Sequence, residues 1–137
     1  MEPTKHQGSC HCGDVRYEVV LDASKGTRCN CRICTKLGTT GSIVKPEAFT
    51  LLSDEANLAT YTRHPEIGCR YFCKRCHVMC FSKGHLAQLG GDFVGINLNT
   101  LDDIDPGSLA LSYWDGRHDN WQAGVRPTPW PIAAASA

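Results

Sequence analysis

Apolar and polar residues alternate between Val15 and Val19, where Val15, Tyr17 and Val19 are separated by Arg16 and Glu18. A period of two is typical of a β-strand with one buried face. Short runs rich in β-branched and aromatic residues recur along the chain, bounded by Gly, Pro, Asp or Asn. We expect strands in these runs, at Ser42 to Val44, Arg70 to Phe72, Val78 to Phe81, Phe93 to Leu98 and Leu109 to Trp114.

Helical periodicity is weak throughout the chain. No segment keeps a 3.6-residue hydrophobic period over the length that a stable helix needs, and the best candidates are single turns after Cys31 and around Pro46 to Phe49. With 137 residues and a hydrophobic content of 42%, the chain has the size of one domain with a modest core. The pattern predicts a mainly β fold in a single small domain.

The charge balance limits the kind of partner. Fourteen Lys and Arg offset fourteen Asp and Glu, so the chain lacks the broad positive field that attracts nucleic acid or anionic membranes. We expect neither as a partner, and the sequence leaves the oligomeric state open. The N-terminal residues lack the apolar stretch of a secretory signal, and no later run approaches the length of a membrane span. These features predict a soluble, cytoplasmic protein.

Nine cysteines are many for this length, and their odd number argues against a fully paired disulfide framework. Seven of them lie in three tight motifs. These motifs are CxC at Cys10 and Cys12, CxCxxC at Cys29, Cys31 and Cys34, and CxxC at Cys73 and Cys76. Clustered thiols in a reducing compartment favour metal binding, and seven of them divide naturally into four and three.

The CxC and CxxC motifs together predict one closed zinc site. Each turn can place two sulfurs on one ion, and two such turns from distant sequence complete a tetrahedron. The expected structural ligands are Cys10, Cys12, Cys73 and Cys76. Gly13 suits the tight turn of such a knuckle, and His77 takes the corresponding place after the second motif. Spacing alone also permits other pairings, including one in which Cys10 and Cys12 join two of the middle thiols.

The middle motif then has three thiolates for a second zinc ion and leaves its fourth position open, which is typical of a catalytic or ligand-binding metal. Three thiolates reduce the Lewis acidity of the ion but still let it stabilise an incoming thiol as thiolate. Cys29, Cys31 and Cys34 are the candidate catalytic ligands. A closed structural site is the alternative, with a fourth ligand from Cys69, Cys80 or a histidine such as His77.

The stretches "GSCHCGDVRYEV", "CNCRIC" and "RYFCKRC", in this order and spacing, resemble the glutathione-dependent formaldehyde-activating enzyme family, which includes centromere protein V. The resemblance implies a fold of coiled antiparallel sheets with zinc knuckles. It also implies a structural zinc on the CxC and CxxC cysteines and a second zinc on the CxCxxC cysteines. His77 replaces the usual Gly after the last motif, and Asn30 replaces the usual His in the middle one. We place the domain at residues 8–130, after an arm over 1–7 and before a flexible tail over 131–137.

The activity that this resemblance implies is carbon-sulfur lyase chemistry on a small thiol-carbonyl adduct such as S-(hydroxymethyl)glutathione, run toward its formation from glutathione and formaldehyde. The alternative is a non-catalytic zinc module that holds a thiol ligand or a protein partner. A glutathione-like thiol carries two carboxylates, for which the sequence offers basic partners. These candidates are Arg32, Lys36, Arg70 and Arg75. No residue can be assigned as general base from spacing.

Overall fold

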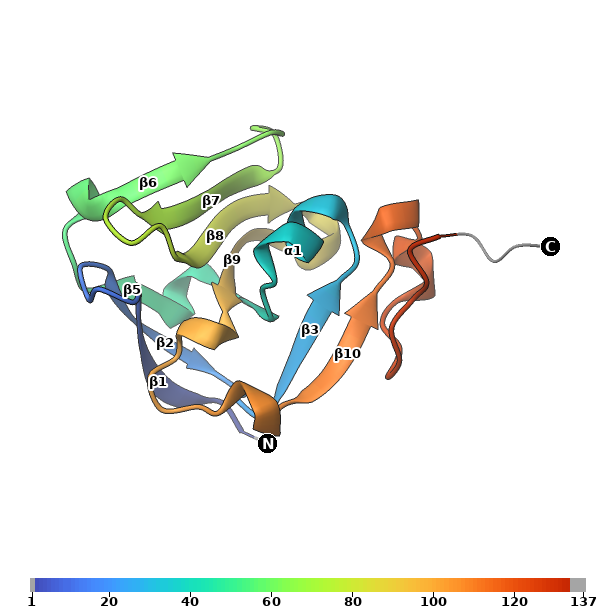
Figure 1. The fold of residues 1–137 in the computed structure, drawn as a ribbon, viewed down its shortest axis with the longest axis horizontal. Helices are drawn as coiled ribbons and strands as arrows, with labels where there is room; N and C mark the ends of the chain where they lie inside the picture. Colours follow the sequence, from blue (N-terminus) through green and yellow to red (C-terminus); the bar gives the residue numbers. More distant parts are fainter. Residues whose placement is uncertain (1, 134–137) are drawn as a thin grey trace.

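A computed structural model describes residues 2–133, and it is mainly β. Within these residues ten strands form two open sheets, and the single α-helix is short (Figure 1). Most of the tail expected over 131–137 lies outside the described residues. Within the described part of the chain, none of the helices has the length and apolar character that a membrane span needs.

The smaller sheet is built by the N-terminal third of the chain. Its strands, in spatial order, are β1 (Thr4–Ser9), β2 (Arg16–Leu21) and β5 (Phe49–Leu51), and both pairings are antiparallel. The residues expected to form an arm over 1–7 therefore include the first four of the six residues of β1, Thr4 to Gln7. The alternating apolar run is β2, in which Tyr17 and Val19 are fully buried and Glu18 is not.

The larger sheet has seven strands in the order β10-β3-β4-β9-β8-β7-β6. Their bounds are β3 (Lys25–Cys29), β4 (Gly41–Val44), β6 (Leu58–Tyr61), β7 (Gly68–Cys73), β8 (Met79–Leu86), β9 (Gly91–Asn97) and β10 (Ala110–Trp114). All pairings are antiparallel except that of β10 with β3, which is parallel and sets Trp114 opposite Cys29. The expected strands from Ser42 to Trp114 all fall in this sheet, but β3 and β6 were not expected.

Helical structure is limited to short pieces. The helix expected after Cys31 is α1 (Arg32–Leu37), which ends at Gly38 in the left-handed conformation with φ 68°. The turn expected near Pro46 is the first of seven 3₁₀ helices in the part of the chain that the structure describes. These are η1 (Pro46–Ala48), η2 (Glu55–Asn57), η3 (Ala87–Leu89), η4 (Leu98–Thr100), η5 (Pro106–Ser108), η6 (Gly116–His118) and η7 (Trp121–Ala123).

Aromatic side chains fill the space between the two sheets. Phe49 of β5 and Phe81 of β8 lie with ring centroids 4.6 Å apart, and Tyr17 of β2 lies 5.5 Å from Phe49. The buried Tyr17 hydroxyl is 2.6 Å from the hydroxyl of Thr100, so its polar end is satisfied. This core holds the small sheet on the large one and thereby brings the β1–β2 turn to the β7–β8 turn (Figure 1).

Candidate metal sites

Four cysteines from two hairpin turns meet at one point. Their sulfur atoms all lie within 4.8 Å of one another, and the set consists of Cys10, Cys12, Cys73 and Cys76, here called the four-cysteine group. The sulfurs of Cys10 and Cys12 are 3.6 Å apart, and those of Cys12 and Cys73 are 3.5 Å apart. These distances are far beyond an S–S bond of about 2.05 Å, and all nine cysteines are free.

The spacing of these sulfurs fits a tetrahedral ion. Zinc bound by thiolates has Zn–S distances of about 2.3 Å, which places the sulfurs of a tetrahedron about 3.8 Å apart. The two measured separations of 3.6 and 3.5 Å are close to this value. Cys10 and Cys73 are buried, so a cation here would be largely shielded from water. The four-cysteine group could therefore hold a metal ion.

Both turns have the backbone that such a site requires. Gly13 and His77, each directly after a CxC or CxxC motif, have positive φ angles of 87° and 65°. Backbone N–H groups of Val15 and Arg75 point at the sulfurs of Cys10 and Cys73, at 3.2 and 3.3 Å. His77 thus serves the turn by its conformation, and it is not a member of either cysteine group.

Asn57 links the two turns, a role that sequence reasoning missed. Its side-chain Nδ2 donates to the carbonyl of Asp14 at 2.9 Å, and its own carbonyl accepts from Lys74 N–H at 2.9 Å. Asp14 follows Gly13 in the first turn, and Lys74 follows Cys73 in the second turn. Because Asn57 is more than 15 residues from either motif, no local pattern could have indicated it.

Cys29, Cys31 and Cys34 form a second group, here called the three-cysteine group, whose sulfurs also lie within 4.8 Å of one another. Cys29 is the last residue of β3, Cys31 precedes α1 and Cys34 lies inside it. All three are partly exposed. The group lies where β3 leads into α1, beside β10 and the C-terminal segment (Figure 1).

The three thiols share one strongly favoured thiolate. The sulfurs of Cys29 and Cys34 lie within 4.8 Å of the Cys31 sulfur, and interaction of their thiols with a Cys31 thiolate lowers the pKa of Cys31 well below its ordinary value. Contacts with Cys29 and then with Cys31 raise the pKa of Cys34, because a thiolate there would face other thiolates. The positive charge of Arg70 also favours the Cys31 thiolate. Full ionisation of all three therefore calls for a cation, which fits the chemistry of a metal site.

No fourth cysteine, histidine or carboxylate of residues 2–133 joins the three-cysteine group within the same 4.8 Å. The fourth ligands considered from the sequence lie elsewhere. Cys80 is fully buried beside the four-cysteine group, where desolvation and the neighbouring cysteines raise its pKa to about 12. Cys69 contacts its own neighbour, with its sulfur 3.6 Å from the carbonyl of Arg70. The observed division of the clustered thiols is thus four and three.

The turn after β10 covers one side of the three-cysteine group. Gly116 lies so close to Cys29 that a Cβ placed on it would be 2.5 Å from the sulfur and 2.7 Å from the Trp121 ring. The ring centroids of Trp114 and Trp121 are 5.8 Å apart, and the Trp121 side chain is half exposed.

Trp130 belongs to a separate contact. Its ring stacks on the Arg126 guanidinium, and its Nε1 donates to the Tyr113 carbonyl. Asp115 and Arg117, which contact Asn30, are further residues that the sequence did not indicate.

The basic residues considered as partners of a substrate carboxylate lie in two places, three of them near the three-cysteine group and one near the four-cysteine group. Arg32 and Lys36 lie exposed on α1, the helix that contains Cys34. Arg70 lies on β7, and its positive charge helps to lower the pKa of Cys31. Arg75 lies in the other turn, where its backbone N–H points at the sulfur of Cys73 and its guanidinium is 3.9 Å from the Asp14 carboxylate. Arg75 therefore belongs to the surroundings of the four-cysteine group.

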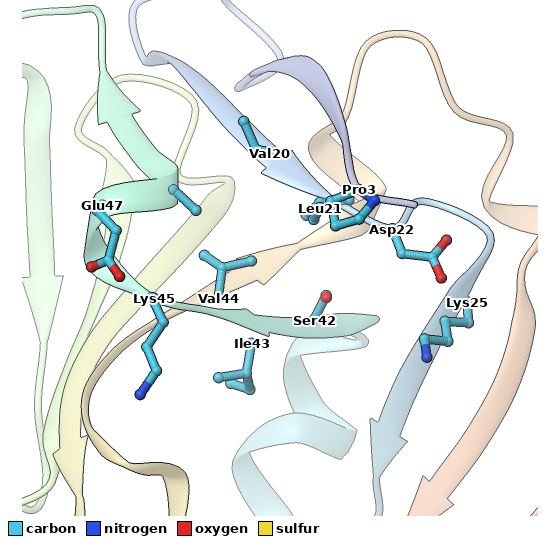
Figure 2. A pocket seen from close by; sticks show the side chains of 11 residues that line it. Pro3, Val20, Leu21, Asp22, Lys25, Ser42, Ile43, Val44, Lys45 and Glu47 are labelled. Carbon is cyan, nitrogen blue, oxygen red and sulfur yellow. The ribbon is translucent and has the colours of Figure 1, made fainter. Parts of the chain in front are cut away.

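An open hollow of about 540 Å³ lies away from both groups, along β4 and the end of β2. Figure 2 shows aliphatic side chains such as Val44 and Ile43 beside the oppositely charged Lys45 and Glu47. None of its lining residues is a cysteine or histidine. Its chemistry is unrelated to that of the cysteine groups.

Comparison with known proteins agrees with the cysteine geometry. The crystal structure of a Rhodobacter sphaeroides protein superimposes with a TM-score of 0.68 at 22% identity, covering 79% of this chain and 98% of that chain, and thus shares the fold. The family model "Glutathione-dependent formaldehyde-activating enzyme" matches residues 5–116, a range that includes both cysteine groups. The chain belongs to the glutathione-dependent formaldehyde-activating enzyme family.

Proposed function

We propose that this protein is a zinc-dependent carbon-sulfur lyase that interconverts a small thiol and formaldehyde with their adduct, with S-(hydroxymethyl)glutathione as the expected adduct. The observation that carries the proposal is the three-cysteine group, which has no fourth protein ligand among the described residues. In this scheme the four-cysteine group holds a structural zinc and the three-cysteine group holds a second one. A zinc ion on three thiolates would take an incoming thiol as its fourth ligand and stabilise it as thiolate.

The chain's own residues define what such a ligand would meet. Cys29 lies at the end of β3, and Cys31 and Cys34 lie at the start of α1. Their three sulfurs therefore lie close enough together to bind one ion. Arg70 brings positive charge to Cys31, and Arg32 and Lys36 extend it along α1. These groups suit the two carboxylates of a glutathione-like thiol, because charge-assisted hydrogen bonds to carboxylates are strong and directional. Trp121 offers an apolar wall beside Cys29.

The reaction balances without a redox partner. In the synthetic direction the sulfur lone pair forms a bond to the formaldehyde carbon, the carbonyl π pair moves to oxygen, and oxygen takes the proton lost by the thiol. In the reverse direction the C–S bond breaks, its electron pair returns to sulfur and the hydroxyl proton leaves. No side chain is assigned as general base, and solvent carries the proton. A cytoplasmic location is part of the proposal, supported by nine unpaired cysteines.

The direct test is NMR exchange spectroscopy on glutathione and formaldehyde with zinc-loaded protein. We expect exchange between free formaldehyde hydrate and the adduct to accelerate at least about tenfold over the protein-free mixture, since stabilised thiolate is the reactive form. S-methylglutathione has no free thiol and should bind without being turned over. Glutathione binding with exchange no faster than in buffer would contradict the lyase and favour the non-catalytic module.

A further inference from the structure

The residue between Cys29 and Cys31 is held by a turn from the other end of the chain. β10 runs parallel to β3 with Trp114 opposite Cys29, so the two strands end at the same edge. Asp115 directly follows Trp114 at the end of β10, and Asn30 directly follows Cys29 at the end of β3. The turn that begins at Asp115 therefore lies directly against the CNC segment.

Asn30 makes four hydrogen bonds with the end of β10 and the turn after it. Its Nδ2 donates to Asp115 Oδ1 at 2.8 Å, and its Oδ1 accepts from the backbone N–H of Arg117 at 2.9 Å. Its main-chain carbonyl accepts from Arg117 Nε at 2.9 Å, and its N–H donates to the Trp114 carbonyl at 3.4 Å. A side chain that makes both side-chain contacts needs a donor and an acceptor, and the Asn30 amide has both.

The Asp115 carboxylate is itself fixed. It is 5% exposed, and His118 Nδ1 lies 2.8 Å from the same Oδ1 that accepts from Asn30. Asn120 Nδ2 donates to Oδ2 at 3.4 Å, and the Asn120 N–H donates to the Asp115 carbonyl at 3.1 Å. A buried carboxylate with this many partners has one orientation, so it can transmit that orientation to Asn30.

We propose that Asp115 and Arg117 are positioning residues of the three-cysteine group, which act through Asn30 to set the relative placement of the Cys29 and Cys31 sulfurs. A site with only three protein ligands depends on their placement before the metal arrives, because each ligand left mobile has to be ordered on binding. Gly116 completes the arrangement, since a side chain there would meet the Cys29 sulfur. This inference rests on the metal-holding part of the proposed function and is independent of the exchange chemistry.

The family model matches residues 5–116, so Arg117 follows directly after the matched range. Both of its contacts with Asn30 span 87 positions in sequence. The end of β10 and the turn after it are thus a functional part of the metal site in this proposal.

The test compares zinc release from the wild type, Asn30→Ala, Asp115→Ala and the double variant. Each zinc-loaded protein is mixed with a chromogenic chelator, and the thiols that become free are alkylated and mapped by mass spectrometry. We expect Cys29, Cys31 and Cys34 to be freed about 10- to 100-fold faster in each single variant, with release from the four-cysteine group unchanged. The double variant should be no faster than the faster single variant, because both changes break one contact chain.

Asn57→Ala is the matched control, because Asn57 is the amide that links the two turns of the other group. It should speed release from the four-cysteine group and leave the three-cysteine group as in the wild type. Equal acceleration at both groups in Asn30→Ala, unchanged release, or multiplicative effects in the double variant would each overturn the inference. A wild type that holds no zinc at the three cysteines would overturn it too. Normal release behaviour in a protein without exchange activity would refute the lyase alone.

Discussion

Replacing Cys73 by serine is expected to abolish the folded state or to lower its melting temperature by roughly 20 °C. Cys73 is fully buried, and its sulfur lies 3.5 Å from that of Cys12, so it joins the chain's start to its middle. A structural zinc contributes on the order of 10 kcal/mol in small zinc domains. An ordinary domain has a total unfolding free energy of about 5–15 kcal/mol. Loss of about 5 kcal/mol already lowers the melting temperature by roughly 20 °C at this chain length.

Cys80→Ser is the control for this experiment. Cys80 is as buried as Cys73 and lies beside the same group, but it is not one of the four cysteines. Placing a hydroxyl there should cost about 1–3 kcal/mol for an ill-satisfied polar group, without loss of zinc. Thermal unfolding followed by circular dichroism, with zinc content measured in the same samples, gives the comparison. If Cys73→Ser and Cys80→Ser melt within a few degrees of each other, the structural role of the four-cysteine group is wrong.

The second large effect is expected on exchange rather than on stability. Cys31→Ser should reduce the thiol-formaldehyde exchange rate to the protein-free level, because serine is not ionised at neutral pH and leaves only two thiolates on the ion. The stability loss should be small, since Cys31 is partly exposed and lies outside the core. The measurement is NMR exchange at equal protein concentration, with melting temperature recorded alongside.

Cys69→Ser is the matched variant here, because Cys69 is also a partly exposed free cysteine but belongs to neither group. It should retain the full exchange rate and both zinc ions. Equal exchange in Cys31→Ser and wild type would remove the three-cysteine group as the active site. Loss of exchange in Cys69→Ser as well would point to a general thiol effect instead.

Several strands could be predicted because the pattern of apolar and polar residues in the sequence matches the pattern of buried and exposed positions. β2 alternates between the core and solvent, and β8 and β9 carry the apolar residues that fill the sheet interface. β1 and β3 were missed because their residues are mostly polar or small. Thr4–Ser9 has one buried residue, and Lys25–Cys29 buries only Gly26. Their strand conformation comes from backbone pairing with β2, β4 and β10, which no local pattern encodes.

The cysteine groups were predictable for a different reason. CxC and CxxC spacings impose short-range geometry, so the grouping into four and three follows once two turns meet. The supporting contacts were not predictable. Asn30 and Asp115 are 85 positions apart, and their contact depends on the parallel pairing of β3 with β10. The ligand role left open for His77 is not supported, because its left-handed backbone explains its place after Cys76.

We propose that the three-cysteine group binds a zinc ion with three protein ligands and leaves the fourth ligand position open to a thiol. Native mass spectrometry of the intact protein, with and without glutathione, tests this directly. We expect two zinc ions per wild-type chain and one bound glutathione, against one zinc ion and no glutathione for Cys31→Ser. S-methylglutathione should bind more weakly to the wild type, because its sulfur cannot become a thiolate. A wild type with a single zinc ion, or a Cys31→Ser protein that keeps two and still binds glutathione, would show that the three-cysteine group is not an open metal site for a thiol.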